Sequence, residues 1–216
     1  IVLEFTDPDI IAEELQKLGY ILDRRGEADD YLDWRSSYEE DIESLVGELE
    51  EDDRPRTFLE TTYKGAGDIG TYSEGSSGNV YLALCGGRNI AANMSVSYPH
   101  VDSEWLITEN PDVIIKYVYS STLDWGWNGT EDPQAILDEV KSRDGWDNIE
   151  AVKNGRVYLI SNELMTGLDS IVGYLYWTKM LHPEFSADPD GAYEEYLTEF
   201  LGIEYPDLIF GYPLPD

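Results

Sequence analysis

Cysteine, histidine and basic residues are scarce in this 216-residue chain, and each shortage excludes a class of site. The single cysteine, Cys85, cannot form an internal disulfide, and at the apolar end of a predicted helix it is expected to be packed. The two histidines, His100 and His182, have no metal-ligating partner at short spacing, so structural roles are predicted for both. No apolar run reaches the roughly 18 residues that a membrane span requires.

The charge of the chain is strongly one-sided. The 45 acidic residues against 14 basic ones give a formal net charge of −31. Such a surface would repel a phosphate backbone, so no nucleic-acid partner is expected. Most carboxylates are interpreted as a solvated surface, which also suits a salty medium. With 42% hydrophobic residues, the chain can nevertheless bury the core of one domain of ordinary size.

Catalytic and cofactor-binding motifs are missing as well. The chain has no GxSxG elbow and no HExxH, and the glycine-rich stretch 63–75 lacks the GxxxxGK[ST] spacing of a phosphate loop. We therefore predict no enzyme activity, no catalytic or metal-ligating residues and no cofactor. Paired carboxylates in so acidic a chain keep two alternatives open, namely a secreted carbohydrate-active hydrolase and a surface cation-binding or adhesion module.

Hydrophobic periodicity predicts an α/β fold. Residues 1–5 have the composition of a strand, and a first helix is expected after the Asp7-Pro8 start, followed by a longer helix from Glu27 to about Glu50. Beyond the acidic run that ends at Arg54-Pro55, strands and helices alternate. Strands are predicted at 56–62, 113–118 and 156–160, and helices at 76–84, 103–109, 133–141, 146–152, 169–181 and 191–201.

This alternation predicts a three-layer αβα lobe with a mostly parallel sheet over residues 54–216, preceded by the long connecting helix. Ser103 is the predicted N-cap of the helix 103–109, and Glu104 lies in its first turn, where the helix dipole favours a carboxylate. Asp188 is interpreted as another helix cap. The proline-bearing tail after Tyr205 is expected to lie along the surface.

Ligands of open parallel sheets collect at the carboxyl ends of the strands, so three loops form the candidate site. These loops contribute Tyr63, Asp68 and Tyr72 (63–75), Trp125, Trp127 and Asn128 (119–129), and Glu163 (161–167). The aromatic rings would stack on a planar or apolar ligand, and the two carboxylates and the amide would be polar contacts. For the tryptophans, folding back onto the lobe is the equally weighted alternative.

Several of these segments together resemble the substrate-binding proteins of ABC importers for iron-siderophores, haem and cobalamin, in which a rigid helix joins two lobes. The resemblance is carried by the helix 27–50, Cys85-Gly86-Gly87-Arg88-Asn89-Ile90-Ala91, Ser103-Glu104-Trp105, Asn110-Pro111-Asp112-Val113-Ile114-Ile115, the stretch 146–158, and His182-Pro183-Glu184. It implies that residues 1–53 hold the last strand of a missing amino-terminal lobe and the interlobe helices. Residues 54–216 would then be the carboxyl-terminal substrate-binding lobe.

The resemblance also implies a function. The protein would capture a metal chelate or tetrapyrrole-like ligand outside the cytoplasm, in the periplasm or anchored at the cell surface, and deliver it to an ABC permease. A monomer is expected. By resemblance, Glu104 would dock into an arginine-bearing pocket of the permease; the alternative is that Glu104 only complements the helix dipole.

Overall fold

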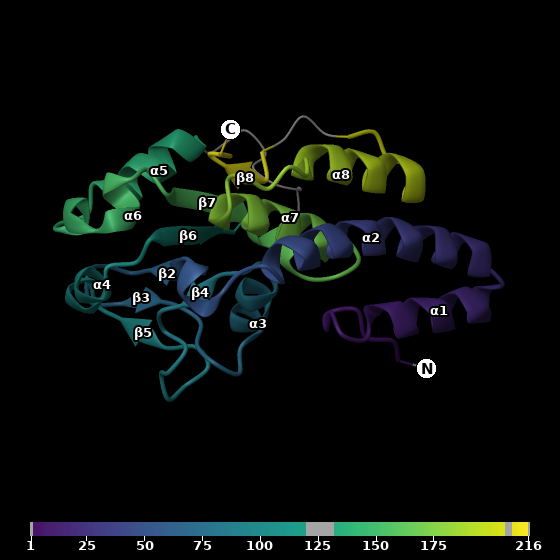
Figure 1. Ribbon diagram of the computed structural model, residues 1–216, viewed down its shortest axis with the longest axis horizontal. Coiled ribbons are helices and arrows are strands. Elements are labelled where there is room, and N and C mark those ends of the chain that lie inside the picture. The colour runs from purple at the N-terminus through teal and green to yellow at the C-terminus, as the bar shows by residue number, and fades with distance from the viewer. Residues whose placement is uncertain (1, 120–131, 206–208, 216) are drawn as a thin grey trace.

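A computed structural model of the chain describes residues 2–119, 132–205 and 209–215. Its centre is a five-stranded sheet with the order β4-β1-β6-β7-β8 (Figure 1). The strands are β1 (Arg56–Glu60), β4 (Arg88–Asn89), β6 (Val113–Val118), β7 (Val157–Ser161) and β8 (Gly211–Tyr212). All neighbouring pairs are parallel except β7 and β8. The predicted α/β class with a mostly parallel sheet is therefore confirmed.

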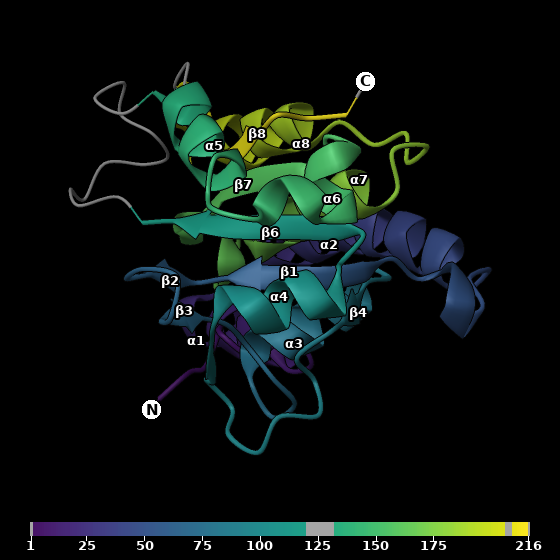
Figure 2. The same cartoon turned by 90° about the vertical axis from the view of Figure 1, so that its left-hand side faces the viewer.

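Helices cover both faces of this sheet, which makes three layers (Figures 1 and 2). One face carries α4 (Ser103–Glu109), α5 (Pro133–Lys141), the 3₁₀ turn η2 (Trp146–Asn148) and α6 (Glu150–Lys153). The other face carries α3 (Ser77–Leu84), α7 (Ser170–Leu181) and α8 (Pro189–Glu195), which continues as η4 (Tyr196–Phe200). The short strands β2 (Thr62–Tyr63), β3 (Ile69–Gly70) and β5 (His100–Val101) form a separate antiparallel sheet.

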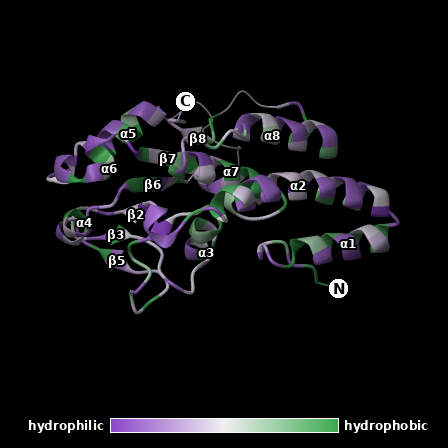
Figure 3. Ribbon diagram, in the orientation of Figure 1, coloured by the Kyte–Doolittle hydropathy of each residue, from purple (hydrophilic) through white to green (hydrophobic). Residues whose placement is uncertain are grey.

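Strand alternation divides the core between the two faces. Phe58, Ile114 and Leu159 point into the cluster under α4, α5 and α6, whereas Leu59 and Ile115 point into the larger cluster under α3 and α7. All five side chains are fully buried. Both faces of the central strands are therefore apolar, as Figure 3 shows by the green colour of β6 and β7.

The long connecting helix is present, with a break before it. Helix α1 (Ile11–Leu22) ends at Asp23, whose φ of 56° lies in the left-handed region, and α2 (Arg25–Val46) lies beside α1 (Figure 1). Both helices contribute to the larger core cluster. Helix α2 ends four residues earlier than predicted, before Gly47, and the acidic run 51–53 forms a single 3₁₀ turn, η1.

One expectation for the amino-terminal segment was wrong, and one stays a prediction. Residues 2–5 have no neighbouring strand in the described part of the chain, so the strand that was assigned to another lobe stays a prediction. Helix α1 begins later than the Asp7-Pro8 start, and the Asp7 side chain instead accepts a hydrogen bond from the backbone nitrogen of Asp9.

The cap of α4 was misplaced by one residue. Asp102 has the extended backbone of an N-cap, and its carboxylate accepts a hydrogen bond from the backbone nitrogen of Trp105 at 2.8 Å. Ser103 lies inside the first turn, and its hydroxyl accepts a hydrogen bond from the Trp146 ring nitrogen at 3.2 Å. The cap predicted at Asp188 is confirmed, since its carboxylate accepts from the nitrogen of Asp190.

The carboxyl-terminal tail does not simply follow the surface. Phe210 is 1% exposed, and Gly211 and Tyr212 form β8 against β7. Gly211 is required there because a Cβ atom would lie 2.5 Å from the Tyr176 ring. The open edge of β7 thus gains a partner, and Phe210 fills the core beneath it.

Candidate ligand-binding face

The carboxyl ends of the parallel strands β1, β6 and β7 lie along one edge of the sheet, on the left of Figure 2. Glu60, Val118 and Ser161 are the last residues of these strands. The small antiparallel sheet begins two residues after Glu60. Loops that follow the strands therefore converge on this edge, which we name the carboxyl edge.

Four tyrosines gather at the carboxyl edge on the α3 and α7 side, and we name them the tyrosine layer: Tyr72, Tyr98, Tyr117 and Tyr119. The ring centroid of Tyr72 lies 5.8 Å from that of Tyr98 and 5.6 Å from that of Tyr117, in edge-to-face geometry. Tyr119 stacks on Tyr117 at 6.4 Å. Tyr98 is 64% exposed and Tyr119 48% exposed, whereas Tyr117 is 3% exposed, so two residues of the layer reach solvent and one is buried.

The hydroxyls of Tyr72, Tyr117 and Tyr119 stay protonated at neutral pH. Burial, together with hydrogen bonding to Tyr119, raises the pKa of Tyr72 to about 12, although a hydrogen bond with Tyr117 lowers it. Burial raises the pKa of Tyr117 well above its ordinary value. The layer can therefore stack on a ligand, and its hydroxyls can donate hydrogen bonds to it.

A buried ion cluster lies at the same edge on the other face of the sheet, and it consists of Glu60, Lys116, Glu139 and Arg143. Arg143 donates from Nη1 to Glu60 Oε2 at 2.5 Å and from Nη2 to Glu60 Oε1 at 3.1 Å. It also donates to both carboxylate oxygens of Glu139, and Lys116 Nζ donates to Glu60. The side chains of Glu60 and Arg143 are 0% and 4% exposed and that of Lys116 is 15% exposed, whereas Glu139 is 52% exposed and closes the cluster on its solvent side.

Two aromatic rings pack on the Arg143 guanidinium of this cluster. The Arg143 guanidinium carbon lies 3.5 Å from the centroid of the Tyr63 ring and 4.6 Å from the Trp146 ring. Such cation–π contacts strengthen as the cation loses water. Tyr63 is thereby committed to covering Arg143 on the α4 and α5 face.

The structure separates the site residues predicted from the sequence. Tyr72 belongs to the tyrosine layer, whereas Tyr63 packs on the opposite face of the sheet. Asp68, between β2 and β3, is hydrogen-bonded to the Nδ1 atom of His100 in β5. Glu163 lies in η3 (Asn162–Met165), directly after β7, and is partly buried.

Other predicted residues lie apart from this edge or outside the described residues. Trp125, Trp127 and Asn128 lie outside the described residues. Glu104 is exposed in the first turn of α4, and Cys85 is buried at the end of α3, as expected. Among the residues that the structure describes, no group of three or more histidine, cysteine, aspartate or glutamate side chains could hold a metal ion.

Sequence reasoning missed Tyr98, Tyr117 and the ion cluster. Tyr117 is the penultimate residue of a strand, so the strand-end argument could have found it. Glu60 also carried a signal, because a carboxylate closing a buried apolar strand needs a partner. Nothing in the local sequence of Arg143 indicates that it reaches Glu60, which lies 83 residues away.

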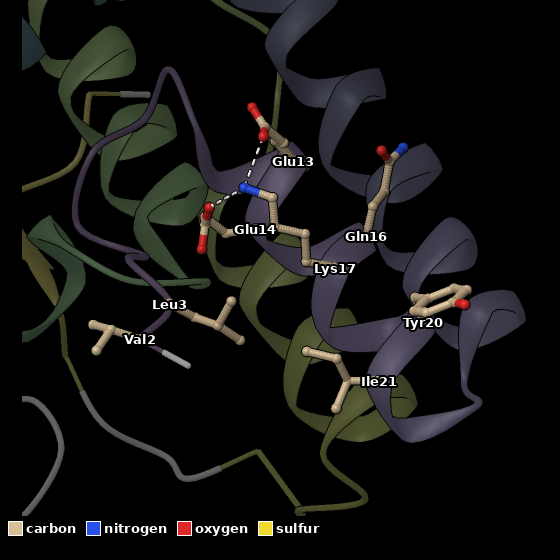
Figure 4. A pocket seen from close by; sticks show the side chains of 8 residues that line it. All are labelled: Val2, Leu3, Glu13, Glu14, Gln16, Lys17, Tyr20 and Ile21. Carbon is tan, nitrogen blue, oxygen red and sulfur yellow. Dashed lines mark hydrogen bonds and ion pairs between the residues drawn. The ribbon is translucent and has the colours of Figure 1, made fainter.

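A surface hollow of about 530 Å³ lies at α1, and the residues that line it belong neither to the tyrosine layer nor to the ion cluster (Figure 4). Its walls are Val2, Leu3, Tyr20 and Ile21, and Lys17 bridges two glutamates of its own helix inside it. Val2 is 94% exposed and Tyr20 67% exposed.

None of the helices in the described ranges is both long and apolar enough to cross a membrane.

Comparison with known proteins identifies a family and a curated relative. The family described as periplasmic binding protein matches residues 2–164. The molybdate-binding protein MolA of Haemophilus influenzae is 22% identical over 208 residues, which cover 92% of this chain and 54% of MolA.

Solved structures agree on the fold. The TroA-like periplasmic binding protein FepB of Veillonella parvula superposes with a TM-score of 0.83 at 21% identity, over 93% of this chain and 60% of FepB. An ABC-type Fe³⁺-hydroxamate transport protein of Saccharomonospora viridis gives 0.58 at 21% identity, over 85% and 58%. The chain therefore spans little more than half the length of these relatives.

Proposed function

This chain belongs to the periplasmic binding protein family, and from that premise we propose that it is part of the solute-binding component of an ABC importer, acting outside the cytoplasm. Proteins of this kind capture a small ligand and present it to a membrane permease, so the protein works as a receptor and not as an enzyme. Because the chain spans only part of its relatives, this role belongs to the full-length protein.

We further propose that the ligand is a metal chelate of the iron-siderophore, haem or cobalamin class. The tyrosine layer is the observation that carries this proposal. Its exposed rings and the protonated hydroxyls of Tyr72 and Tyr119 suit the apolar and oxygen-rich surface of a chelate that already holds its metal. The predicted contacts Asp68, Trp125, Trp127, Asn128 and Glu163 would add to this surface, whereas Tyr63 would act only through Arg143.

A bare oxyanion is the second candidate, because MolA binds molybdate according to its name. Such an ion needs cationic side chains or several N–H donors that are free to face it. At the carboxyl edge, Arg143 and Lys116 already bind carboxylates, and the net charge of the chain is −31. These charges favour the chelate over the oxyanion.

The exposed face of α1 supports a first lobe elsewhere in the full-length protein. Tyr20, Ile21 and Leu22 of α1 are all more than two-fifths exposed, and so is Val2, which precedes the helix. Figure 4 shows Val2, Tyr20 and Ile21 around the hollow, and together these side chains form a large apolar surface. We propose that residues 1–53 connect to that lobe through α1 and α2, and that residues 54–216 form the second lobe. The ligand would lie between the first lobe and the carboxyl edge.

Binding of a ligand panel tests the ligand class. Isothermal titration of the full-length protein with a ferric hydroxamate chelate, haemin, cyanocobalamin and sodium molybdate should give submicromolar binding for one of the three chelates. Tyr119→Ala should weaken that binding about ten-fold, whereas Tyr119→Phe, which keeps the ring, should retain most of it. Tight binding of molybdate alone would favour the second candidate.

Docking of the permease is the second testable element. Glu104 is exposed at the start of α4, where an arginine pocket could reach it. Glu104→Arg should abolish uptake with ligand affinity unchanged, and Glu194→Arg, at an exposed position of α8, should leave uptake intact. Normal uptake by Glu104→Arg would assign Glu104 to the helix dipole only. Analytical sedimentation of the purified full-length protein and of both variants checks the expected monomer.

A further inference from the structure

Arg35 of α2 is a buried cation that the proposed function does not use. Its side chain is 3% exposed and donates from Nη1 to the Ser170 hydroxyl at 3.3 Å and to the Tyr31 hydroxyl at 3.4 Å. Its Nε donates to Glu39 Oε1 at 2.7 Å. Among the described residues, Nη2 has no hydrogen-bond partner. The guanidinium therefore lies against the first residue of α7.

The segment on the other side of this contact is the β7–α7 loop, residues 162–169, which contains η3 and leaves the carboxyl edge. The Tyr31 hydroxyl donates to the backbone oxygen of Leu168, and Arg35 reaches Ser170. The two contacts lie on either side of Asp169 and both start from α2. The end of the loop is thus held to the long helix by hydrogen bonds 135 and 137 residues apart in sequence.

Charge explains why this contact is specific. Burying a guanidinium costs free energy unless carboxylates face it. Glu39, the carboxylate bonded to Arg35, is 41% exposed, so water screens part of its charge. Asp169 supplies a second negative charge from the N-cap of α7. An apolar side chain at position 35 would pack α2 on α7 equally well, but it would not select one position of the loop.

We propose that Arg35 is a positioning residue of the ligand-binding face, which fixes the β7–α7 loop, and with it Glu163, to helix α2. The loop and the connecting helix then move as one body when the carboxyl edge engages a ligand. Only this joint movement of the loop and the helix on ligand binding rests on the proposed function. The attachment itself is a property of the unliganded protein.

Hydrogen exchange of the unliganded full-length protein tests the attachment. In Arg35→Met, backbone amides of residues 162–169 should exchange about ten-fold faster or more, because a charge-assisted contact is lost, while β1 and β6 keep their protection. Arg35→Lys should restore part of the protection. Arg24→Met is the matched control, since Arg24 lies next to the same helix, its side chain is 70% exposed, and it forms an ion pair with Glu27.

A second readout separates positioning from packing. Burial raises the pKa of Asp169 to about 6, and the charge of Arg35 opposes that rise. The other titratable groups that face Asp169 are Tyr31, Tyr193 and Tyr196, which are neutral at this pH. Carboxyl-carbon NMR should therefore find the pKa of Asp169 above 6 in Arg35→Met and returned toward 6 in Arg35→Lys.

Three results would overturn the proposal: unchanged exchange at 162–169, an equal rise of exchange throughout the chain, or an unmoved Asp169 titration in Arg35→Met. None of these measurements includes a ligand. A failure to bind any member of the panel would therefore count against the proposed function and leave this test unaffected.

Discussion

Replacing Glu60 by glutamine should be among the most destabilising single changes in the described part of the chain. Glu60 is fully buried and accepts two hydrogen bonds from Arg143 and one from Lys116. Glutamine has nearly the same shape, so no cavity forms. Its amide group, however, places N–H donors against the donors of Arg143.

The expected cost follows from the charges left behind. Arg143 would stay buried with Glu139 as its one carboxylate, and Lys116 would lose its carboxylate partner. Breaking a buried ion pair by removing one partner costs about 3–5 kcal/mol. Because a domain is stable by only about 5–15 kcal/mol, Glu60→Gln should remove a large part of the free energy of unfolding.

Urea unfolding followed by tryptophan fluorescence measures this cost. Arg143→Met and the double variant Glu60→Gln/Arg143→Met complete a double-mutant cycle, in which the double variant should be about 1–3 kcal/mol more stable than the sum of the single changes predicts. Glu13→Gln is the control, because Glu13 is 68% exposed in its pair with Lys17 and should cost under about 0.5 kcal/mol. A cost below about 1 kcal/mol for Glu60→Gln, or strict additivity, would refute the reasoning.

Three further predictions concern titration and salt. Burial raises the pKa of Asp169 from 3.8 to about 6, so the folded state holds this proton more tightly, and the resulting stability is lost as pH rises from 3.8 through 6. As pH rises from 3.5 to 7.5, the free energy of unfolding of Asp169→Asn, measured in urea, should therefore increase relative to that of the wild type by up to about 3 kcal/mol. A difference between the two proteins that does not change with pH would contradict this. Burial lowers the pKa of His182, so stability should fall as pH drops below 6.5, and His182→Gln should show a smaller loss between pH 7.5 and 5 by the same assay. The net charge of −31 implies that the carboxylates repel one another in the folded protein. The Tm measured by calorimetry should therefore rise between 0.1 and 1 M KCl, because the screening length shortens from about 10 to 3 Å. An unchanged Tm would show that this repulsion is negligible.

Much of the fold could be predicted because its signals are local. The run Val113–Val118 is apolar on both faces, and this pattern alone is typical of a central parallel strand. The same holds for the helix spacing of α2 and for Asp188 as a cap. The expectation that ligands meet the carboxyl edge also follows from the alternation of strands and helices along the chain.

The candidate site could be predicted less well, because the sheet decides which side chains share a face. Tyr63 and Tyr72 belong to the same loop in the sequence, yet β2 directs Tyr63 onto Arg143 while Tyr72 joins Tyr117 across the sheet. Asp68 was expected to contact the ligand, and its neighbour His100 comes from a strand 32 residues later.

The amino-acid sequence by itself determined the alternation of strands and helices, the acidic surface and the edge where the loops after the parallel strands gather, since these depend on spacing and composition. Tertiary structure alone decided the ion cluster of Glu60 and Arg143, the hold of Arg35 on the start of α7 and the pairing of β8 with β7. Each of these joins residues at least 50 positions apart, and local propensity carries no information about such pairs.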